Sequence, residues 1–299
     1  MRHPAHLMAA SELGKRVASA LVLAPVAVAC IWFGDAPLAA LVACAAAAGA
    51  WEFYRMVAGA GAGVRPFART GIAIAGVLPI LVHAQTLGVV RVPLTAGVFL
   101  TLALLGASVW RRGVDGRPLL AVATTLLGIA YVAVPLSYGY ALRNFPYAVG
   151  RAAGTAVLLL PVLGTWASDV GAYFAGRAIR GPKLLPSVSP GKTVAGAVGG
   201  LVATAVVAVL YERYALRPYA QLAFLPGRAL AFGLAVSAAA QLGDLVESLL
   251  KREAGVKDSS NLIPGHGGVL DRVDSLLFVL PVSYVLLGAL LIPALGAIR

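Results

Sequence analysis

Residues 118–142 read PLLAVATTLLGIAYVAVPLSYGYAL and contain no acidic or basic side chain. A helix of this length would extend about 38 Å along its axis, which exceeds the roughly 30 Å hydrocarbon core of a bilayer. In lipid only helices and closed barrels satisfy their own backbone hydrogen bonds. Because barrel strands would be short and alternating in polarity, the stretch predicts a transmembrane helix.

The same composition extends along the whole chain. Of its 299 residues, 60% are hydrophobic and 12% are charged, and the mean hydropathy is +0.87. Soluble domains carry roughly 25% charged residues, and disordered chains are far less hydrophobic, so both classes are excluded. We predict an all-α polytopic integral membrane protein with about nine spans of roughly 20 residues each. They run over about 17–34, 37–54, 70–90, 92–110, 118–142, 153–176, 193–211, 228–250 and 273–296.

The basic residues predict the orientation of these spans. If the N-terminus lies inside the cell, 17 of the 24 Lys and Arg residues fall on inner segments, and the seven on outer segments are Arg91, Arg143, Arg151, Arg213, Arg217, Arg228 and Arg299. The positive-inside rule then favours an inner N-terminus and an outer C-terminus. The net charge of +12 therefore indicates anionic lipid at the inner membrane surface, and we expect no nucleic-acid partner.

The acidic residues are concentrated in the second half of the chain. Eight of the twelve lie between Asp169 and Asp274. An acid within a span is costly, so by default it indicates function. We therefore expect residues 1–150 to form a transmembrane scaffold and residues 151–299 to form a catalytic region with its active site at the cytoplasmic face.

The richest polar segment begins in the predicted span 228–250. At 100° per residue, Asp244, Ser248 and Lys251 fall within about 60° on one helical face, with Arg252 beside them. A carboxylate, a hydroxyl and two cations therefore point the same way at the inner surface. The alternative is that the cations only end the helix at the lipid headgroups.

The loop that follows adds further candidate ligands. Lys257 and Asp258 precede the turn Pro264-Gly265-His266-Gly267-Gly268, whose glycines let the backbone approach an anion. Asp271 and Asp274 then lie three residues apart, so both can face one cation on a helix. Paired carboxylates beside several cations suit Mg²⁺ bound to phosphate oxygens, as phosphoryl or nucleotidyl transfer requires.

Two other stretches carry candidate residues. Asp169 lies within the span 153–176, in the sequence TWASDVGAYFAGR. Gly191-Lys192-Thr193 resembles the end of a Walker A loop, but Pro186 stands where that loop requires glycine, which excludes an NTPase P-loop. Ser189, Lys192 and Thr193 could still bind phosphate at a helix N-terminus, or Thr193 could be a plain N-cap.

Together these stretches resemble the phosphatidate cytidylyltransferases (CDP-diacylglycerol synthases). The resemblance is carried by Ser248-Leu249-Leu250-Lys251-Arg252, Lys257-Asp258, the turn 264–268 and Asp271-Arg272-Val273-Asp274. It covers the chain from about residue 150 onward. One departure is Ala195, where relatives often have Glu, and this leaves the role of the loop 189–200 open.

The resemblance implies a reaction of CTP with phosphatidate that gives CDP-diacylglycerol and pyrophosphate in phospholipid biosynthesis. It implies Mg²⁺ as cofactor, with a second cation, divalent or K⁺, as an open alternative. It further implies an enzyme of the bacterial cytoplasmic (inner) membrane that could form a homodimer. The expected metal ligands are Asp244, Asp271 and Asp274, and the other catalytic residues are Ser248, Lys251 and Arg252. The expected substrate-binding residues are Asp169, Ser189, Lys192, Thr193, Lys257, Asp258, His266, Gly267, Gly268 and Arg272.

Other functions make different demands on the sequence. CDP-alcohol phosphatidyltransferases need Gly after the last Asp of an Asp-x-x-Asp-Gly motif and further acids downstream, whereas Ser275 follows Asp274 and no acid comes after it. A membrane transporter that uses Asp169 as a coupling site is an alternative, but the polar set lies on one side of the membrane. A polyprenol or phytol kinase is the third possibility.

Overall fold

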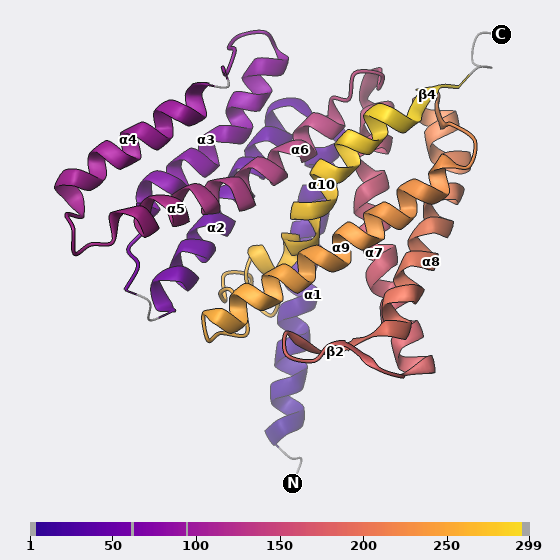
Figure 1. Cartoon of the computed structure of the whole chain (residues 1–299). Helices are drawn as coiled ribbons and strands as arrows, with labels where there is room; N and C mark the ends of the chain where they lie inside the picture. The colour runs from indigo at the N-terminus through magenta and orange to yellow at the C-terminus, as the bar shows by residue number, and fades with distance from the viewer. Residues whose placement is uncertain (1–3, 61–62, 94, 295–299) are drawn as a thin grey trace.

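The computed structural model describes residues 4–60, 63–93 and 95–294, with the backbone alone for residues 4–13 and 15. Each of the nine predicted spans coincides with helical structure (Figure 1). The helices are α1 (Pro4–Phe33), α2 (Asp35–Gly59), α3 (Ala68–Thr86), α4 (Thr95–Arg111), α5 (Pro118–Gly128), α6 (Val134–Arg143), α7 (Gly150–Ile179), α8 (Val194–Tyr211), α9 (Arg228–Glu253) and α10 (Leu270–Leu290).

The lengths of these helices confirm a polytopic membrane protein. Among the described residues, eight helical segments are long and apolar enough to cross a membrane. One of them, Pro118–Arg143, joins α5, the π-helical segment η1 (Ile129–Ala133) and α6 into one rod. The remaining predicted span corresponds to α4, an apolar helix of 17 residues.

The two π-helical segments occur beside prolines. Proline has no N–H to donate, and its ring clashes with the carbonyl four residues earlier. Pro135 lies two residues after the end of η1, and Pro218 lies inside η2 (Glu212–Ala220), which continues α8. A widened turn accommodates such a defect without ending the helix, so both spans continue past their prolines.

Four short strands depart from the expectation of helices alone. β1 (Lys183–Leu185) pairs antiparallel with β2 (Ser189–Thr193), and β3 (Leu222–Phe224) pairs antiparallel with β4 (Leu291–Pro293). The β1–β2 hairpin replaces helix because Pro182, Pro186 and Pro190 recur every four residues and would each remove a helical hydrogen bond. The hairpin connects α7 to α8 and carries Lys192 to the end of the bundle.

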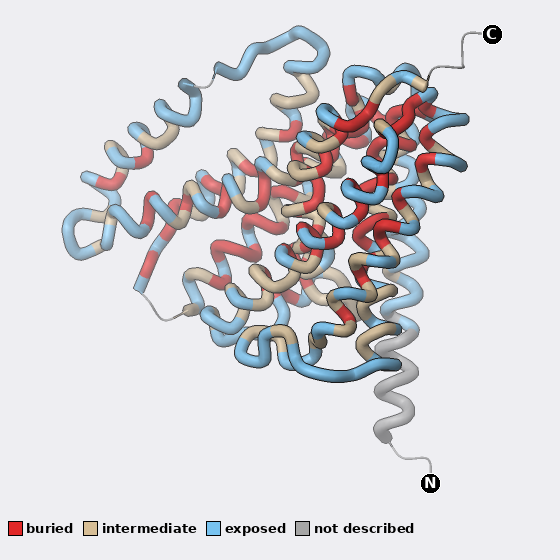
Figure 2. Tube along the Cα trace, turned by 45° about the vertical axis from the view of Figure 1, so that its right-hand side comes forward, coloured by how far each residue is buried: buried red, intermediate tan, exposed pale blue. Residues whose placement is uncertain are grey.

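One hydrophobic core extends through both halves of the chain (Figure 2). Its fully buried members include Tyr54 and Leu142 from the first half and Leu160 and Leu287 from the second. In contrast, none of the apolar window Arg16–Phe33 of α1 is buried. The proposed scaffold and catalytic regions therefore share a core, and α1 lies outside it.

The ends of the molecule differ in polarity. The start of α1, the β1–β2 hairpin and the loop between α9 and α10 lie at one end, and β4 lies at the opposite end (Figure 1). Nearly all the residues predicted to form the site belong to the first of these ends, which we call the polar end.

Candidate functional site

An ion pair joins α9 to the hairpin at the polar end. Nζ of Lys192 lies 2.6 Å from Oδ2 of Asp244, and both side chains are about one-third exposed or less. Ser248, one helical turn after Asp244, donates a hydrogen bond of 3.4 Å to Oδ1 of the same carboxylate. The structure thus brings together three of the predicted site residues from two separate elements.

This ion pair lies in the wall of a cavity of about 910 Å³. The cavity is bounded by α7, β1, β2, α8 and α9. Its charged lining residues are Asp169, Arg177, Arg180, Lys183, Lys192 and Asp244. Four cations outnumber two carboxylates, so the cavity suits a polyanion such as a triphosphate.

Hydrogen bonds fix the walls of this cavity. Thr193 Oγ1 accepts from the N–H of Gly196 and caps the N-terminus of α8, as expected for a plain N-cap. Gln241 donates to the carbonyl of Ala197 and to Oγ of Ser237, at 3.1 Å each. The bond from Gln241 to Ala197 joins α9 to α8 beside the ion pair.

A third carboxylate, that of Asp274 in α10, approaches from the other side. It interacts electrostatically with both Asp169 and Asp244, and Asp169 interacts with Asp244 in turn. The carboxylates of Asp169 and Asp244 line the same cavity, and Asp274 of α10 lies within electrostatic range of both. Only Asp244 among them forms an ion pair within the part of the chain that the structure describes.

Asp271 belongs to a different cluster. Its Oδ1 accepts from Lys251 at 2.8 Å, and its Oδ2 accepts from the hydroxyl of Ser259 and the N–H of Gly268, both at 2.8 Å. Lys251 also pairs with the buried Glu247, one helical turn earlier. Both oxygens of Asp271 are thus occupied by protein donors, and its role here is to shape the loop 259–268.

Glu52, from α2 in the first half, completes this cluster. Its carboxylate is fully buried and accepts from the hydroxyl of Ser260 at 2.5 Å and from the N–H groups of Val269 and Leu270 at 2.9 and 2.6 Å. Ser259 contributes a further bond at 3.3 Å. The carboxylate therefore sits at the N-terminus of α10, where the helix dipole favours a negative charge.

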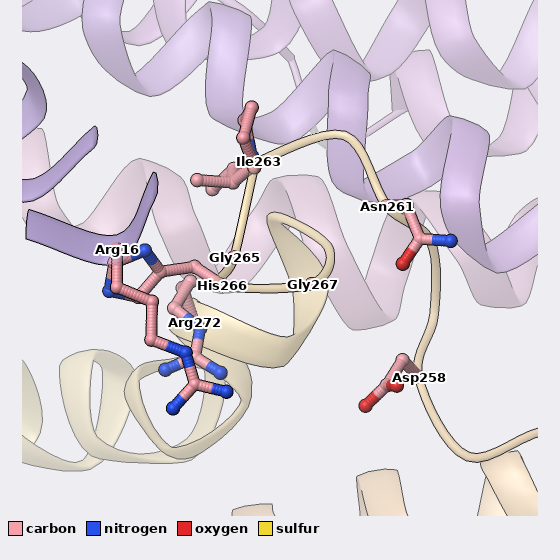
Figure 3. Close-up of a pocket in the computed structure, with 9 residues that line it drawn as sticks. Arg16, Asp258, Asn261, Ile263, Gly265, His266, Gly267 and Arg272 are labelled. Carbon is pink, nitrogen blue, oxygen red and sulfur yellow. The ribbon is translucent and has the colours of Figure 1, made fainter. Parts of the chain in front are cut away.

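A second cavity, of about 610 Å³, lies beside the turn 264–268. Its lining includes Arg16 from α1 together with Asp258, His266, Gly267 and Arg272, four of the predicted substrate-binding residues. Figure 3 shows Arg16, His266 and Arg272 gathered on one side of the turn, with Asp258 and Asn261 across from them. Eight of the sixteen predicted site residues therefore line one of these two cavities, four in each.

Some predicted residues join neither cavity. Ser189 lies on β2 opposite Leu185, while Arg252 and Lys257 are exposed beside the end of α9, and none of the three lines a described cavity. The three expected metal ligands are also divided, since Asp271 faces Lys251 rather than Asp244. Among the side chains that the structure describes (14, 16–60, 63–93 and 95–294), no three His, Cys, Asp or Glu residues form a cluster that could hold a metal ion.

The chain is similar to a known protein family along most of its length. The model of the cytidylyltransferase family matches residues 14–290, which is nearly the whole chain. The chain belongs to the cytidylyltransferase family. A relative named phosphatidate cytidylyltransferase from Pseudomonas aeruginosa is 34% identical over 303 residues, which covers 93% of this chain and 97% of the relative.

Shorter alignments with other cytidylyltransferases show higher identity. The phosphatidate cytidylyltransferase of Bacillus subtilis is 48% identical over 122 residues, and that of Haemophilus influenzae is 47% identical over 128 residues. These alignments cover 41% and 43% of this chain, and they span 44% of the length of each relative. Identity is therefore concentrated in part of the chain, and the resemblance to the family is confirmed.

The sequence analysis missed two acidic residues of the cluster around Asp271. Glu247 lies one turn before Lys251 on the same helical face, and that spacing could have indicated it. Glu52 is an acid inside a predicted span, which is a signal of function in itself. Its partners are 207 to 218 residues away, so the sequence held no sign of what it contacts.

Proposed function

We propose that this protein transfers the cytidylyl group of CTP to phosphatidate, forming CDP-diacylglycerol and pyrophosphate. The observation that carries the proposal is family membership along residues 14–290, with named phosphatidate cytidylyltransferases among the relatives. The cavity of about 910 Å³ with its excess of cations supports it, since CTP is a polyanion of suitable size for such a pocket.

In this reaction an oxygen of the phosphatidate phosphate attacks the α-phosphorus of CTP. The bond from the α-phosphorus to the oxygen that bridges to the β-phosphate breaks, and pyrophosphate leaves with the bonding electrons. The phosphate is already anionic near neutral pH, so no strong general base is needed. The main task is positioning two anions against their mutual repulsion.

The cationic side chains of the cavity can meet that requirement. Lys192 is held at Asp244 by a 2.6 Å ion pair, and Arg177, Arg180 and Lys183 line the same cavity. We infer that these four cations bind the triphosphate and stabilise the departing pyrophosphate. Preorganised charges of this kind act where negative charge develops and so lower the barrier.

We also propose that Mg²⁺ binds beside CTP, held by Asp244 and Asp274. Mg²⁺ in phosphoryl-transfer sites uses one or two carboxylates together with substrate phosphates and water, so a complete protein cluster is not required. The converging carboxylates of Asp169, Asp244 and Asp274 would be stabilised by a cation. The ion would neutralise phosphate charge, while Asp271, saturated by protein donors, shapes the adjacent loop.

The location follows from the same reasoning. The eight candidate spans indicate an integral membrane protein, and the named relatives are bacterial. We propose that the enzyme resides in the bacterial cytoplasmic membrane with its polar end toward the cytoplasm. Phosphatidate would then reach the site without leaving the bilayer, and CTP would enter from the cytoplasm.

An assay with two labelled nucleotides tests the proposed function. Purified protein is incubated with phosphatidate, a polyprenol, phytol, Mg²⁺ and CTP labelled at either the α- or the γ-phosphorus. We expect the α-label to enter the lipid and the γ-label to leave in pyrophosphate. Transfer of the γ-label to a polyprenol or phytol would indicate a lipid kinase instead. Absence of label from every lipid would overturn both enzymatic functions and leave a transporter.

A further inference from the structure

The second cavity is formed where α1 meets the turn 264–268. Oγ of Ser19 lies 3.2 Å from the carbonyl oxygen of Pro264 and 2.8 Å from Nδ1 of His266. Gly265 has a φ of +75°, and a Cβ at that position would lie 2.8 Å from Cγ of Arg16. Only glycine allows this approach, so α1 and the turn together make the wall of the cavity (Figure 3).

This wall carries two unpaired cations. Neither Arg16 nor Arg272 has an ion pair or a side-chain hydrogen bond within the part of the chain that the structure describes. Asp258 is the one acidic side chain in the lining. The two guanidinium groups therefore leave the cavity with a net positive charge. Guanidinium groups bind phosphate through paired, charge-assisted hydrogen bonds, and His266 beside them can contribute another.

An apolar hollow of about 440 Å³ continues from the same wall. It is lined by Ala18, Ser19, Val22 and Leu23 of α1 and by Leu262, Ile263 and Pro264, the last two of which it shares with the charged cavity. Val22 is 64% exposed and Leu262 is 51% exposed. The hollow therefore places an apolar lining directly beside the charged cavity.

The order of these features along α1 matches a bilayer surface. Arg16 is the first residue of the apolar window of α1, where arginine extends toward the headgroups. Leu23 lies about 10 Å deeper along the helix, at the level of the acyl chains. A phosphate beside Arg16 and a hydrocarbon chain beside Val22 would therefore be spaced as they are in one phospholipid.

We propose that α1 and the turn 264–268 bind an anionic membrane phospholipid. Its phosphate lies between Arg16 and Arg272, and one acyl chain lies in the hollow along residues 18–23. The choice of phosphatidate as this lipid rests on the proposed function, whereas the binding of an anionic headgroup does not. A zwitterionic lipid fits less well, because its ammonium group would face the same guanidinium groups.

Photolabelling of the full chain in lipid nanodiscs tests this site. The nanodiscs contain phosphatidylcholine and a trace of phosphatidate that carries a diazirine on one acyl chain, and CTP is left out. We expect label on peptides that contain residues 16–23 and 262–264. Excess unlabelled phosphatidate should remove it, and excess phosphatidylcholine should not.

Three variants sharpen the test. Arg16→Gln should reduce the label about tenfold, the scale of one charge-assisted hydrogen bond, and Val22→Trp should reduce it by filling the hollow. Arg69→Gln removes the same charge from the first turn of α3 and should leave the label unchanged. A label that ignores headgroup charge, or that is unchanged in both Arg16→Gln and Val22→Trp, would overturn the proposal.

The result is separable from that of the proposed function. Specific labelling without formation of any CDP-lipid would retain the lipid site and reject the transferase. In contrast, full transferase activity with an unchanged KM for phosphatidate in both Arg16→Gln and Val22→Trp, together with no specific label, would reject the lipid site alone.

Discussion

The carboxylate of Glu52 joins segments that are more than two hundred residues apart in the sequence. It accepts two backbone N–H groups at the start of α10 and the hydroxyls of Ser259 and Ser260. The N–H groups at the start of a helix have no acceptor within the helix. If they are buried without an acceptor, the folded state loses stability. Glu52 therefore holds α10, with Asp271 and Asp274, in a defined position.

Replacing Glu52 by Gln tests this positioning role. The amide has one oxygen in place of two, and its NH₂ group would face the N–H donors of Val269 and Leu270. We expect Glu52→Gln to lower kcat about tenfold or more, because loss of a hydrogen bond to a charged group costs roughly 1.5–3 kcal/mol. The KM for CTP should change little, since Glu52 does not line the cavity of about 910 Å³.

Glu212→Gln serves as the matched control for Glu52. Glu212 is also nearly buried, and it accepts from Arg217 and from the N–H of Phe224 at the end of the molecule opposite the site. We expect this variant to lower the melting temperature while kcat stays near that of the parent. An equal loss of kcat in both variants would mean that Glu52 stabilises the fold without positioning the site.

Asp274 and Asp271 are predicted to differ in their relation to Mg²⁺. Asp274→Asn should raise the Mg²⁺ concentration needed for half-maximal activity and cost about 2–3 kcal/mol of transition-state stabilisation. Asp271→Asn should lower the melting temperature and kcat with an unchanged Mg²⁺ requirement, because its oxygens bind Lys251, Ser259 and Gly268. Titration of activity with Mg²⁺ in both variants measures this, and the reverse pattern would return the metal to Asp271.

Gly243 lies at a close approach between α9 and α10. A Cβ at Gly243 would lie 2.7 Å from the carbonyl oxygen of Asp274 and 3.0 Å from Cα of Ser275. Both are backbone atoms, so the helices could not relax by moving a side chain. Close packing through small residues is how helices associate within membranes, and here it brings Asp244 and Asp274 onto facing surfaces.

Gly243→Ala should therefore separate the two helices and misplace Asp274. We expect a lower melting temperature in detergent and at least a tenfold loss of kcat, since small displacements of reacting groups are costly. Gly288→Ala is the control, because a Cβ at that position in α10 meets nothing within 4 Å. Near-normal activity in Gly243→Ala would show that the spacing of α9 and α10 does not set the site.

The sequence predicted the positions of the helices better than it predicted the segments between them and the contacts that pack them together. Apolar runs such as 118–142 required helices, and the structure has helix over each of them. The π-helical turn before Pro135 and the hairpin with Pro182, Pro186 and Pro190 were within reach, because proline marks both, but hydropathy alone does not distinguish them. The close approach at Gly243 depends on which helices are neighbours, and periodicity does not specify that.

At the scale of the whole molecule, the sequence predicted that the polar residues would form one site. In the structure most of these residues lie in two cavities and in the cluster around Asp271. Helical spacing correctly joined Asp244 to Ser248, because both are on one helix. It also joined them to Lys251, whose side chain turns instead toward Glu247 and Asp271. Partners from other elements decide such choices, and a single sequence does not reveal them.

The first half of the chain contributes more than a scaffold. Glu52 of α2 reaches the start of α10, and Arg16 of α1 lines the second cavity. A single hydrophobic core also crosses residue 150. A division of the chain at residue 150 therefore marks where the charged motifs begin. The hydrophobic core includes residues on both sides of it.

The distribution of positive charge gives a prediction for the entire molecule. With 17 of the 24 cations on inner segments, the segment between α4 and α5 should face the cytoplasm and the segment between α6 and α7 should face outward. Val114 and Val149 are 92% and 88% exposed in these two segments. Each therefore offers a site where a cysteine would be accessible to a reagent.

Thiol labelling in intact bacterial cells measures this orientation. In a parent carrying Cys30→Ala and Cys44→Ala, a membrane-impermeant maleimide should label Val149→Cys at once and Val114→Cys only after the membrane is permeabilised. The cysteine-free parent should stay unlabelled in both conditions. The reverse order would place the polar end outside the cell, where no cytoplasmic CTP reaches it, and would contradict both the orientation and the proposed reaction.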